Sequence, residues 1–503
     1  MFFYKNLLKG KKSQKKEYSY DLLGNNQKSE KDDNVLKYSE PKVIFNYINE
    51  DGALRAGYGF ENLCMPTSKS DLESETQISV RGNAVRGLWQ IKWYDSTTSH
   101  TDKYYLFYFN DENLICYDNI LDNRYITLIV NNTFTEVPTA TYYRHDSEDS
   151  LLLSGEGSNL MLISGGGVSQ SENNKKIVSC CTHYGKLFAI TREKRGNLIY
   201  TENTNILSWT TEGLEDLDFG DGRGNLNKII SFDDYLFLFR DFGITKVSIY
   251  GNDEFSISHM YFSDSYIYPN SIVQDGDYVY FLTKSGLKVF NGSSVKDVNI
   301  DCMSYVNACE NSNCSATCFE GKYFLACRGD FGDDEVIGCE GFENGYINNM
   351  LLVYDISNGH TEITRGVDIH QLLALNNPFK SKLIACFNNE HIGKIGQLTK
   401  DGQLFGESLK GLISFARTDF GKPDVKKRIR SILIKSDKNC SVFIENEDKT
   451  YEFSISGKNK IQKIRANILG KSFGVRIEAE DNETKINKFV LQVEEWLFFI
   501  KII

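Results

Sequence analysis

The sequence predicts an all-β protein: a β-propeller of six or seven blades, followed by a small antiparallel β-sandwich and preceded by a flexible N-terminal arm. Three observations support this prediction. A short apolar run recurs along the middle of the chain, the C-terminal part alternates between apolar and polar positions, and the composition favours strands. Aromatic residues make up 13% of the 503 residues, with 40 Gly and only 6 Pro, which is typical of short strands joined by tight turns.

The first element is an N-terminal arm, residues 1–45. Its stretch 9–40 is rich in Lys, Asn, Glu and Ser, and Lys11, Lys12, Lys15 and Lys16 make its start basic. Such a composition buries too little apolar surface to become ordered by itself. We therefore expect a solvated arm that becomes ordered only against a partner.

The second element, residues 46–403, contains a repeat in which a turn residue precedes about four apolar or aromatic residues. The runs are DKYYLFYF from Asp102, DSLLLS from Asp149, GKLFAI from Gly185, DYLFLF from Asp234, DYVYFL from Asp277, GKYFLA from Gly321 and SKLIAC from Ser381. Successive starts lie 47, 36, 49, 43, 44 and 60 residues apart. These steps centre on the length of one four-stranded propeller blade, and the apolar runs suit strands that are buried on both faces. Seven runs favour seven blades, while the uneven steps leave six open.

Asp-Phe-Gly tripeptides occur four times, starting at Asp218, Asp241, Asp330 and Asp419. A protein kinase uses this tripeptide once, to hold magnesium, together with a glycine-rich loop, a strand lysine and a catalytic loop, which we do not find here in order. In DYLFLF-RDFG-ITKVSIYG the tripeptide separates two apolar runs, as TKSG does in DYVYFL-TKSG-LKVFNG. We therefore interpret it as a hairpin turn, with Ser285-Gly286 at the corresponding turn of the next repeat.

The third element is residues 404–503, and the pattern of apolar residues changes near its start, at Phe405. Strict alternation of apolar residues appears at Val442/Ile444, Tyr451/Phe453/Ile455, Val475/Ile477/Ala479 and Phe489/Leu491/Val493. Period two over several strands predicts a half-buried antiparallel sheet, here a small β-sandwich. The ending WLFFIKII is too short to span a bilayer and suits a last strand that packs on this chain or on a neighbour; no membrane-spanning segment is expected.

Charge and cysteine content limit the partners and cofactors. The formal net charge of −11 predicts that the surface as a whole repels nucleic acid rather than binding it tightly. Six of the 12 Cys lie between Cys302 and Cys339, without the paired CxxC spacing that is usual in zinc sites. We expect reduced thiols, with zinc at Cys309, Cys314 and Cys318 as the alternative.

Two acidic loops are the remaining candidate metal sites. One offers Asp216, Asp218 and Asp221, with Gly220 where an EF-hand has a ligand, and the other offers Asp330, Asp333 and Asp334. Solvated loops are expected at both, with calcium as the alternative.

No other signature of catalysis or cofactor binding is found in the sequence. The histidines form no HExxH or other close metal-binding pair, and nucleophile-elbow and Walker A motifs are lacking. They are His100, His145, His183, His259, His360, His370 and His391. We therefore predict no catalytic, cofactor-binding or metal-binding residues and no enzyme; a hydrolase built on a propeller remains an alternative.

The order of several hairpin motifs resembles a known family. GNLIYTENTNILSWT (196–210) precedes DFGDGRGNLNKIISFDDYLFLFRDFGITKVSIYG, and YVYFLTKSGLKVFNGSSVKDV (278–298) follows. LLVYDISNGHTEI (351–363) and GALRAGYGFENL (52–63) suit a later blade and the entry strand. Over residues 50–400 this order resembles the β-propeller tail proteins of short-tailed bacteriophages, the hub, nozzle or packaged-DNA stabilisation proteins. Thr361-Glu362 stands where that family usually has Trp after the turn.

The resemblance implies a structural role in a virion tail. Such proteins form a ring, commonly of six copies, below the portal and adaptor, where they extend the DNA channel and help to retain the packaged genome until ejection. This implies assembly in the host cytoplasm and a final place in the tail. The acidic net charge is compatible with DNA that slides past without tight binding.

The alternative in a different class is a receptor- or glycan-binding propeller at a tail tip or cell surface. Its expected signature is a group of exposed aromatic side chains on the loops at one end of the blades. Tyr261, Tyr266 and Tyr268 in MYFSDSYIYPN are the candidates, although packing between strands accounts for them equally well.

Overall fold

The computed structural model of the protein describes residues 11–20, 22, 39, 41–50, 53–63, 85–95, 101–109, 113–118, 130–131, 134–145, 148–164, 167–171, 175–201, 206, 215–250, 254–300, 302–307, 309–331, 345–375, 381–479 and 484–498. Within them, strands dominate; the helical elements whose bounds are defined are α1 (Met303–Asn307) and the 3₁₀ turns η2 (Pro269–Ser271) and η4 (Asn389–His391). The prediction of an all-β chain is confirmed.

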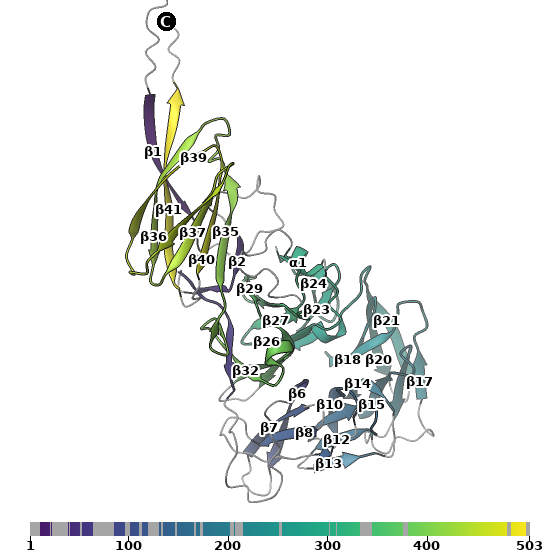
Figure 1. Ribbon diagram of the computed structural model, residues 1–503. Coiled ribbons are helices and arrows are strands. Elements are labelled where there is room, and N and C mark those ends of the chain that lie inside the picture. The colour runs from purple at the N-terminus through teal and green to yellow at the C-terminus, as the bar shows by residue number, and fades with distance from the viewer. Residues whose placement is uncertain are drawn as a thin grey trace, which may run out of the picture.

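Seven sheets follow one another along the described part of the chain, as in a β-propeller (Figure 1). The first three are β6 (Gly87–Asp95), β7 (Thr101–Phe109), β8 (Asn113–Asp118) and β9 (Val130–Asn131); β10 (Thr139–His145), β11 (Glu148–Ser154), β12 (Met161–Ser164) and β13 (Gly167–Gln170); and β14 (Ile177–His183), β15 (Lys186–Thr191), β16 (Asn197–Thr201) and β17 (Glu215–Asp218). The next three are β18 (Leu226–Phe232), β19 (Tyr235–Arg240), β20 (Gly243–Tyr250) and β21 (Glu254–Phe262); β22 (Val273–Asp275), β23 (Tyr278–Thr283), β24 (Gly286–Phe290) and β25 (Val295–Asp297); and β26 (Ser315–Phe319), β27 (Lys322–Cys327), β28 (Met350–Asp355) and β29 (Thr361–Arg365). The last has the order β30 (Ile369–Leu375), β31 (Lys382–Phe387), β32 (Ile395–Thr399), β5 (Gly59–Asn62), β33 (Gln403–Leu404) and β34 (Glu407–Ser408).

Each of the seven recurring apolar runs forms the second strand of one sheet. These strands are β7, β11, β15, β19, β23, β27 and β31. The preceding turns explain the Asp or Gly at the start of several runs. At Tyr184-Gly185, Asp233-Asp234 and Glu320-Gly321 two consecutive residues have positive φ, the conformation of a type I′ hairpin turn. The long 60-residue step contains residues 332–344, which lie outside the described residues.

Buried side chains fill the spaces between neighbouring sheets. Phe239 of β19 packs edge-to-face on Phe281 of β23, with 5.5 Å between ring centroids, and Trp89 of β6 shares a cluster with Leu151 of β11. Corresponding clusters join each other pair of successive sheets. Burial of both faces of the second strands β15, β19, β23, β27 and β31 agrees with their nearly uninterrupted apolar sequences.

The first and last sheets meet and close the ring. The side chain of Gln371 on β30 accepts a hydrogen bond from the Leu88 N–H of β6 at 3.0 Å and donates one to the Leu88 carbonyl at 2.8 Å. At other places a serine hydroxyl links neighbouring first strands, as where the Ile229 N–H donates to Ser179 Oγ at 3.1 Å. The last sheet also takes β5 from the N-terminal part of the chain, antiparallel to β32, which leaves no gap in the sequence of sheets.

Two further sheets lie beside the ring and form what we call the double sheet. One has the order β3 (Tyr47–Glu50), β4 (Ala53–Ala56), β41 (Ile486–Phe498), β36 (Lys427–Ser436) and β39 (Gln462–Gly470), and β1 (Lys11–Tyr20) also pairs with β41. The other has the order β2 (Pro41–Phe45), β35 (Gly411–Thr418), β40 (Phe473–Ala479), β37 (Cys440–Glu445) and β38 (Thr450–Ile455).

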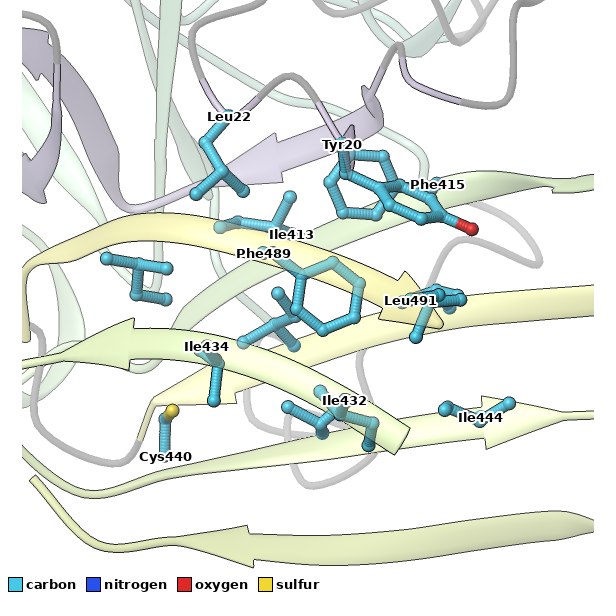
Figure 2. Close-up of a cluster of buried hydrophobic side chains, with 14 of the residues drawn as sticks. Tyr20, Leu22, Ile413, Phe415, Ile432, Ile434, Cys440, Ile444, Phe489 and Leu491 are labelled. Atoms are coloured by element: carbon cyan, nitrogen blue, oxygen red, sulfur yellow. The ribbon is translucent and has the colours of Figure 1, made fainter. Parts of the chain in front are cut away.

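One cluster of buried side chains lies between these two sheets (Figure 2). Ile432, Ile434 and Leu491 from one sheet and Ile413 and Ile444 from the other belong to it. The alternating apolar positions of the C-terminal sequence therefore face a common interior, as period two requires. The first three residues of the final apolar segment, 496–498, are the end of β41 and pair with β1, and residues 499–503 lie outside the described residues.

The N-terminal segment differs from the expected arm. Residues 11–20 form β1, antiparallel to β41 from Lys11↔Phe498 to Tyr20↔Phe489. Tyr20 is buried and packs edge-to-face on Phe415 and Phe489, with ring centroids 4.8 and 5.2 Å apart. Composition did not predict this strand because its partner is supplied by the opposite end of the chain. Residues 1–10 and most of 21–40 lie outside the described residues.

The expected boundaries also shift. Strands β2, β3 and β4, residues 41–56, belong to the double sheet and not to an arm or to the ring, and β33 and β34 extend the last ring sheet to Ser408. Ring strands thus occupy 59–62 and 87–408 rather than 46–403. The N-terminal strands carry too short an alternation to be assigned to a sheet whose other members follow 350 residues later.

Asn46 links the ring to the double sheet. It has a positive φ of 61° and is 5% exposed. Its Oδ1 accepts a hydrogen bond from the Arg365 N–H of β29 at 2.7 Å, and its Nδ2 donates to the Lys410 carbonyl at 2.7 Å. Next to it, Phe45 packs edge-to-face on Phe331 with 5.2 Å between ring centroids. The two parts are therefore joined by buried polar and aromatic contacts.

Candidate functional site

A group of charged side chains surrounds Arg240, at the end of β19. Arg240 is 1% exposed. Its guanidinium lies 2.7 Å from the Asp221 carboxylate and donates hydrogen bonds to the carbonyls of Phe219 at 2.7 Å and Gly224 at 2.9 Å. All three acceptors belong to the segment that leads from β17 to β18. A buried arginine thereby holds this connection against the neighbouring sheet.

Asp221 is shared between two arginines, and a histidine lies nearby. Arg223 lies 3.0 Å from its carboxylate, and His259 Nε2 lies 3.6 Å away. Burial raises the pKa of Asp221, but the hydrogen bonds from Arg240 and Arg223 outweigh burial and hold that pKa below its usual range. Burial, followed by the charge of Arg223, lowers the pKa of His259. The carboxylate is thus ionised and neutralised by arginines, which suits it to holding structure rather than to accepting a proton.

The Asp-Phe-Gly at Asp241 is the turn between β19 and β20, as predicted. Its Asp also bonds to the start of β18 in the same sheet: it accepts from the Asn225 N–H at 2.8 Å and from Asn227 Nδ2 at 2.9 Å. Arg195, from the β15–β16 connection of the preceding sheet, donates to the Leu226 carbonyl at 2.8 Å and to Asn227 Oδ1. The tripeptide therefore fixes the β19–β20 turn on β18, and Arg195 links β18 to the preceding sheet.

The other three Asp-Phe-Gly copies also follow strands. The Gly220 N–H donates to Asp218 Oδ1 at 2.9 Å, and the Gly421 N–H donates to Asp419 Oδ1 at 2.7 Å. Phe219, Phe331 and Phe420 are buried. In two of these copies the aspartate closes a short turn, and in all three the phenylalanine is buried, so each copy has a structural use.

The aspartates of the two candidate calcium loops have other roles or lie outside the described residues. Asp221 is occupied by arginines, Asp218 closes its own turn, and the side chains of Asp216, Asp333 and Asp334 lie outside the described residues. No group of three or more His, Cys, Asp or Glu side chains suited to a metal ion is found among the described residues.

Five cysteines of the predicted 302–339 group lie in the described part, and Cys339 lies outside it. All five are free thiols, and Cys302, Cys314 and Cys327 are buried. Burial raises the pKa of Cys314 and of Cys318 to about 12. Protonated thiols of this kind pack as small apolar side chains.

The histidines lie apart in the described structure. His183 Nδ1 is 2.9 Å from Ser231 Oγ on the neighbouring sheet, and burial lowers the pKa of His183. His360, His370 and His391 lie elsewhere in the ring, and His100 and the side chain of His145 lie outside the described residues.

The three candidate tyrosines are used mostly in packing. Tyr268 is 1% exposed, Tyr266 packs edge-to-face on it with 5.5 Å between ring centroids, and Tyr261 contacts Phe281. The exposed aromatic side chains here are instead Phe242, 41% exposed, and Phe262, 64% exposed.

Phe242 and Phe262 lie at one edge of the β18–β21 sheet. The Ser263 N–H donates to the Phe242 carbonyl at 3.1 Å, and the Arg223 guanidinium lies 3.9 Å above the Phe262 ring. Sequence reasoning missed both phenylalanines. A usable signal was that Phe242 occupies a two-residue turn, where a side chain has no strand neighbour to cover it.

Comparison with known proteins identifies no family. No protein-family model and no curated protein matches the sequence. Among solved structures, the extracellular domain of the putative one component system BT4673 from B. thetaiotaomicron has 10% identity and a TM-score of 0.42, covering 87% of this chain and 62% of that one. BamB from Moraxella catarrhalis has 11% identity and a TM-score of 0.33, covering 62% and 98%. BBS1N in complex with ARL6DN has 9% identity and a TM-score of 0.36, covering 59% and 86%.

All three TM-scores lie below 0.5, so the account of the fold rests on the strand pairing described above. None of the helices in the described part of the chain has the length and apolar character needed to cross a membrane.

Proposed function

We propose that this chain is a structural protein of a bacteriophage tail, a hub, nozzle or stopper ring at the head–tail connection. The observation that carries the proposal is the order of hairpin motifs in residues 196–298. Those motifs fall on three successive sheets: GNLIYT on β16, DYLFLFRDFGITKVSIY on the β19–β20 hairpin, and YVYFLTKSGLKVF on the β23–β24 hairpin. The turn of the last hairpin lies at Lys284-Ser285, one residue earlier than expected.

The fold proposal that accompanies this function is a seven-bladed propeller with an appended β-sandwich. Seven successive sheets, the shared clusters between them and the Gln371–Leu88 hydrogen bonds support seven blades rather than six. The single apolar cluster between the two remaining sheets supports the sandwich.

The assembly proposed is a ring of copies, with six as the number that the family resemblance implies. It would sit below the portal and adaptor, extend the DNA channel and help to retain the genome before ejection. The net charge of −11 supports passage of DNA without tight binding. The role proposed is non-enzymatic, in a virion assembled in the host cytoplasm.

Electron microscopy of the purified full-length chain and of native particles tests this proposal. We expect closed rings in the purified protein, and density for the chain in the tail below the portal. A protein that stays monomeric at all concentrations and is missing from virions contradicts the proposal.

A second candidate function, glycan or receptor binding, is favoured by one observation. Exposed Phe242 and Phe262 lie close together beside Arg223, and exposed aromatic faces are what sugar rings stack on. A glycan array probed with wild type and with Phe242→Ala/Phe262→Ala tests it. Binding that the double substitution removes would favour this candidate, whereas an array without signal for wild type rejects it.

A further inference from the structure

A basic groove crosses the outer face of the double sheet. It lies over strands β1, β41, β36 and β39, whose arrangement Figure 1 shows. Its volume is about 670 Å³, and four cationic residues of the outer face line it, namely Lys15, Arg430, Lys463 and Arg465. Lys16 also borders the groove, but it is paired with the core residue Val493 and its side chain lies on the core side, next to Glu495. The groove lies on the opposite side of the sheet from the apolar core, because the residues that alternate with these cations, such as Ile464 and Ala466, pack against that core.

Strand register explains why the face is hollow here. Glu17, Gln492, Ser431 and Arg465 are paired in one row across the four strands. A β-bulge between Ile429 and Ser431 interrupts β36, so that its register shifts against both neighbours. The small Ser431 is buried in the middle of the row, and longer cationic side chains stand on both sides of it.

A chain of hydrogen bonds holds the floor of the groove. Ser431 Oγ donates to Gln492 Oε1 at 2.6 Å, and Gln492 Nε2 donates to the Glu17 carboxylate at 2.7 Å. The one carboxylate that lines the groove is therefore already held by an amide. The floor is fixed without using any of the cations.

The cations divide into two sets. Arg430 lies 2.5 Å from the Glu494 carboxylate, and Lys16 lies 3.2 Å from that of Glu495. Lys15, Lys463 and Arg465 are exposed and have no carboxylate partner among the described residues. Three unpaired cations in one groove are unusual in a chain whose net charge is −11. They attract anionic groups, which the rest of the surface repels.

We propose that this groove binds an extended acidic segment of a partner polypeptide. Four strands about 4.8 Å apart span about 14 Å, a distance that four or five extended residues cover at about 3.3 Å each. Carboxylates at alternate positions of such a segment lie on one side, where those at one end face Lys463 and Arg465 of β39 and those at the other end face Lys15 of β1. The proposal uses only the charges and register of the double sheet and does not rest on the proposed tail function.

A polypeptide fits this groove better than a nucleic acid. Among the described residues that line it there is no aromatic side chain, so they offer bases no surface on which to stack. The attraction is also local, since exposed charges interact within about 8 Å at physiological salt. A short acidic peptide lies within that range of the three cations, whereas a long nucleic acid also meets the acidic remainder of the surface.

Fluorescence anisotropy with the full-length protein tests the proposal. The probe is a short labelled peptide in which Asp alternates with Ser, measured at about 0.05 M salt, where screening is weak. The groove variant is Lys463→Glu/Arg465→Glu. The matched control, Lys458→Glu/Lys460→Glu, makes the same change of charge at exposed positions just outside the groove.

We expect the peptide to bind wild type, the groove variant to weaken binding at least about tenfold, and the control variant to change it less than about twofold. A peptide with Asn in place of Asp should not bind. Equal losses in both variants overturn the proposal, since only the overall charge would then matter. A labelled single-stranded oligonucleotide that binds the same groove more tightly than the peptide also overturns it.

Discussion

The ring and the double sheet are both antiparallel, but their paired strands lie at very different distances along the chain. Sheets such as β14–β17 and β18–β21 consist of four consecutive strands. In the double sheet, β1 pairs with β41 and β2 pairs with β35, from opposite ends of the chain. A ring sheet can form from one local segment, whereas the double sheet requires both termini to meet, which costs more loop-closure entropy.

The ring has its own long-range contacts, and they are few. The last sheet takes β5 from near the N-terminus, and Gln371 joins it to the first sheet through Leu88. The comparison therefore predicts that substitutions in the double sheet disturb many distant strands together, while most substitutions in the ring act on one or two sheets.

The largest effect is expected from removal of residues 1–22. This removes β1, takes Tyr18, Tyr20 and Leu22 out of the core cluster, and leaves one edge of β41 open. Loss of three largely buried side chains should lower the free energy of unfolding of the double sheet by on the order of 5 kcal/mol. Urea unfolding combined with hydrogen exchange, comparing β36 and β39 with β19 and β23, measures it.

Removal of residues 1–10 alone is the control, because it leaves β1 complete. Unchanged protection of β36 and β39 after removal of 1–22 would contradict the role of β1.

A smaller effect is expected from Glu495→Gln at one end of the double sheet. Glu495 is 0% exposed; Tyr18 Oη donates to it at 2.8 Å, and Lys16 and Lys422 pair with it. Neutralising this buried partner should lower the free energy of unfolding by about 3 kcal/mol. Chemical denaturation measures it, with the exposed Glu452→Gln on β38 as the control expected to change little. Equal stabilities of the two variants would show that the buried carboxylate contributes nothing specific.

The same residue makes stability depend on pH. Burial raises the pKa of Glu495, but hydrogen bonds from Lys422, Tyr18 and Lys16 outweigh burial and hold that pKa below its usual range. A lowered pKa stabilises the fold above the unfolded-state value, about 4.3, and this contribution is lost as the pH falls through the folded-state value. The difference in unfolding free energy between wild type and Glu495→Gln should therefore be constant above about pH 5 and shrink below about pH 4. A difference that does not change with pH would assign the effect to packing.

Asn46→Ala tests the connection between the two parts. It removes two buried hydrogen bonds, to the Arg365 N–H and the Lys410 carbonyl, and places alanine at a φ of 61°. We expect a loss of about 2 to 3 kcal/mol, seen in calorimetry as a wider separation between the transitions of the ring and the double sheet. Asn467→Ala, exposed and at a φ of 60°, measures the cost of the backbone conformation alone. Equal losses in the two variants would mean that the hydrogen bonds of Asn46 do not join the parts.

The smallest effect is expected from Gln371→Leu at the ring closure. It removes both hydrogen bonds to Leu88 while keeping a similar volume. The loss should be about 1 to 2 kcal/mol, with faster hydrogen exchange confined to β6 and β30. Gln274→Ala, at an exposed position of β22, is the control. Faster exchange throughout the ring would show instead that closure holds all seven sheets together.

The candidate site shows which structural features the sequence patterns predict and which they do not. The turn at Asp241 was predicted, because Asp and Gly between two apolar runs have few other uses. Its bonds to Asn225 and Asn227, and the insertion of Arg240 against Asp221, were not predicted. They depend on how the start of β18 lies beside the β19–β20 turn and on how the β17–β18 connection meets β19, and the spacing of residues along the chain does not encode either arrangement.

The basic groove is likewise only partly predictable from the sequence. Lys463 and Arg465 alternate with apolar residues, so their place on an outer face follows from the sequence. Lys15 joins them only because β1 lies on β41, and the bulge at Ser431 sets the depth of the groove.

By itself, the sequence determined the all-β class, the seven apolar runs, the hairpin turns between them and the alternation of the C-terminal strands. Each of these is a local property, since strand period and turn chemistry act over a few residues. Only the tertiary structure decided that β1 and β2–β4 belong to the double sheet, that β5 completes the last ring sheet, and which charges meet in the groove. Those outcomes depend on pairing between segments hundreds of residues apart, and such pairing is selected by the packing of whole sheets.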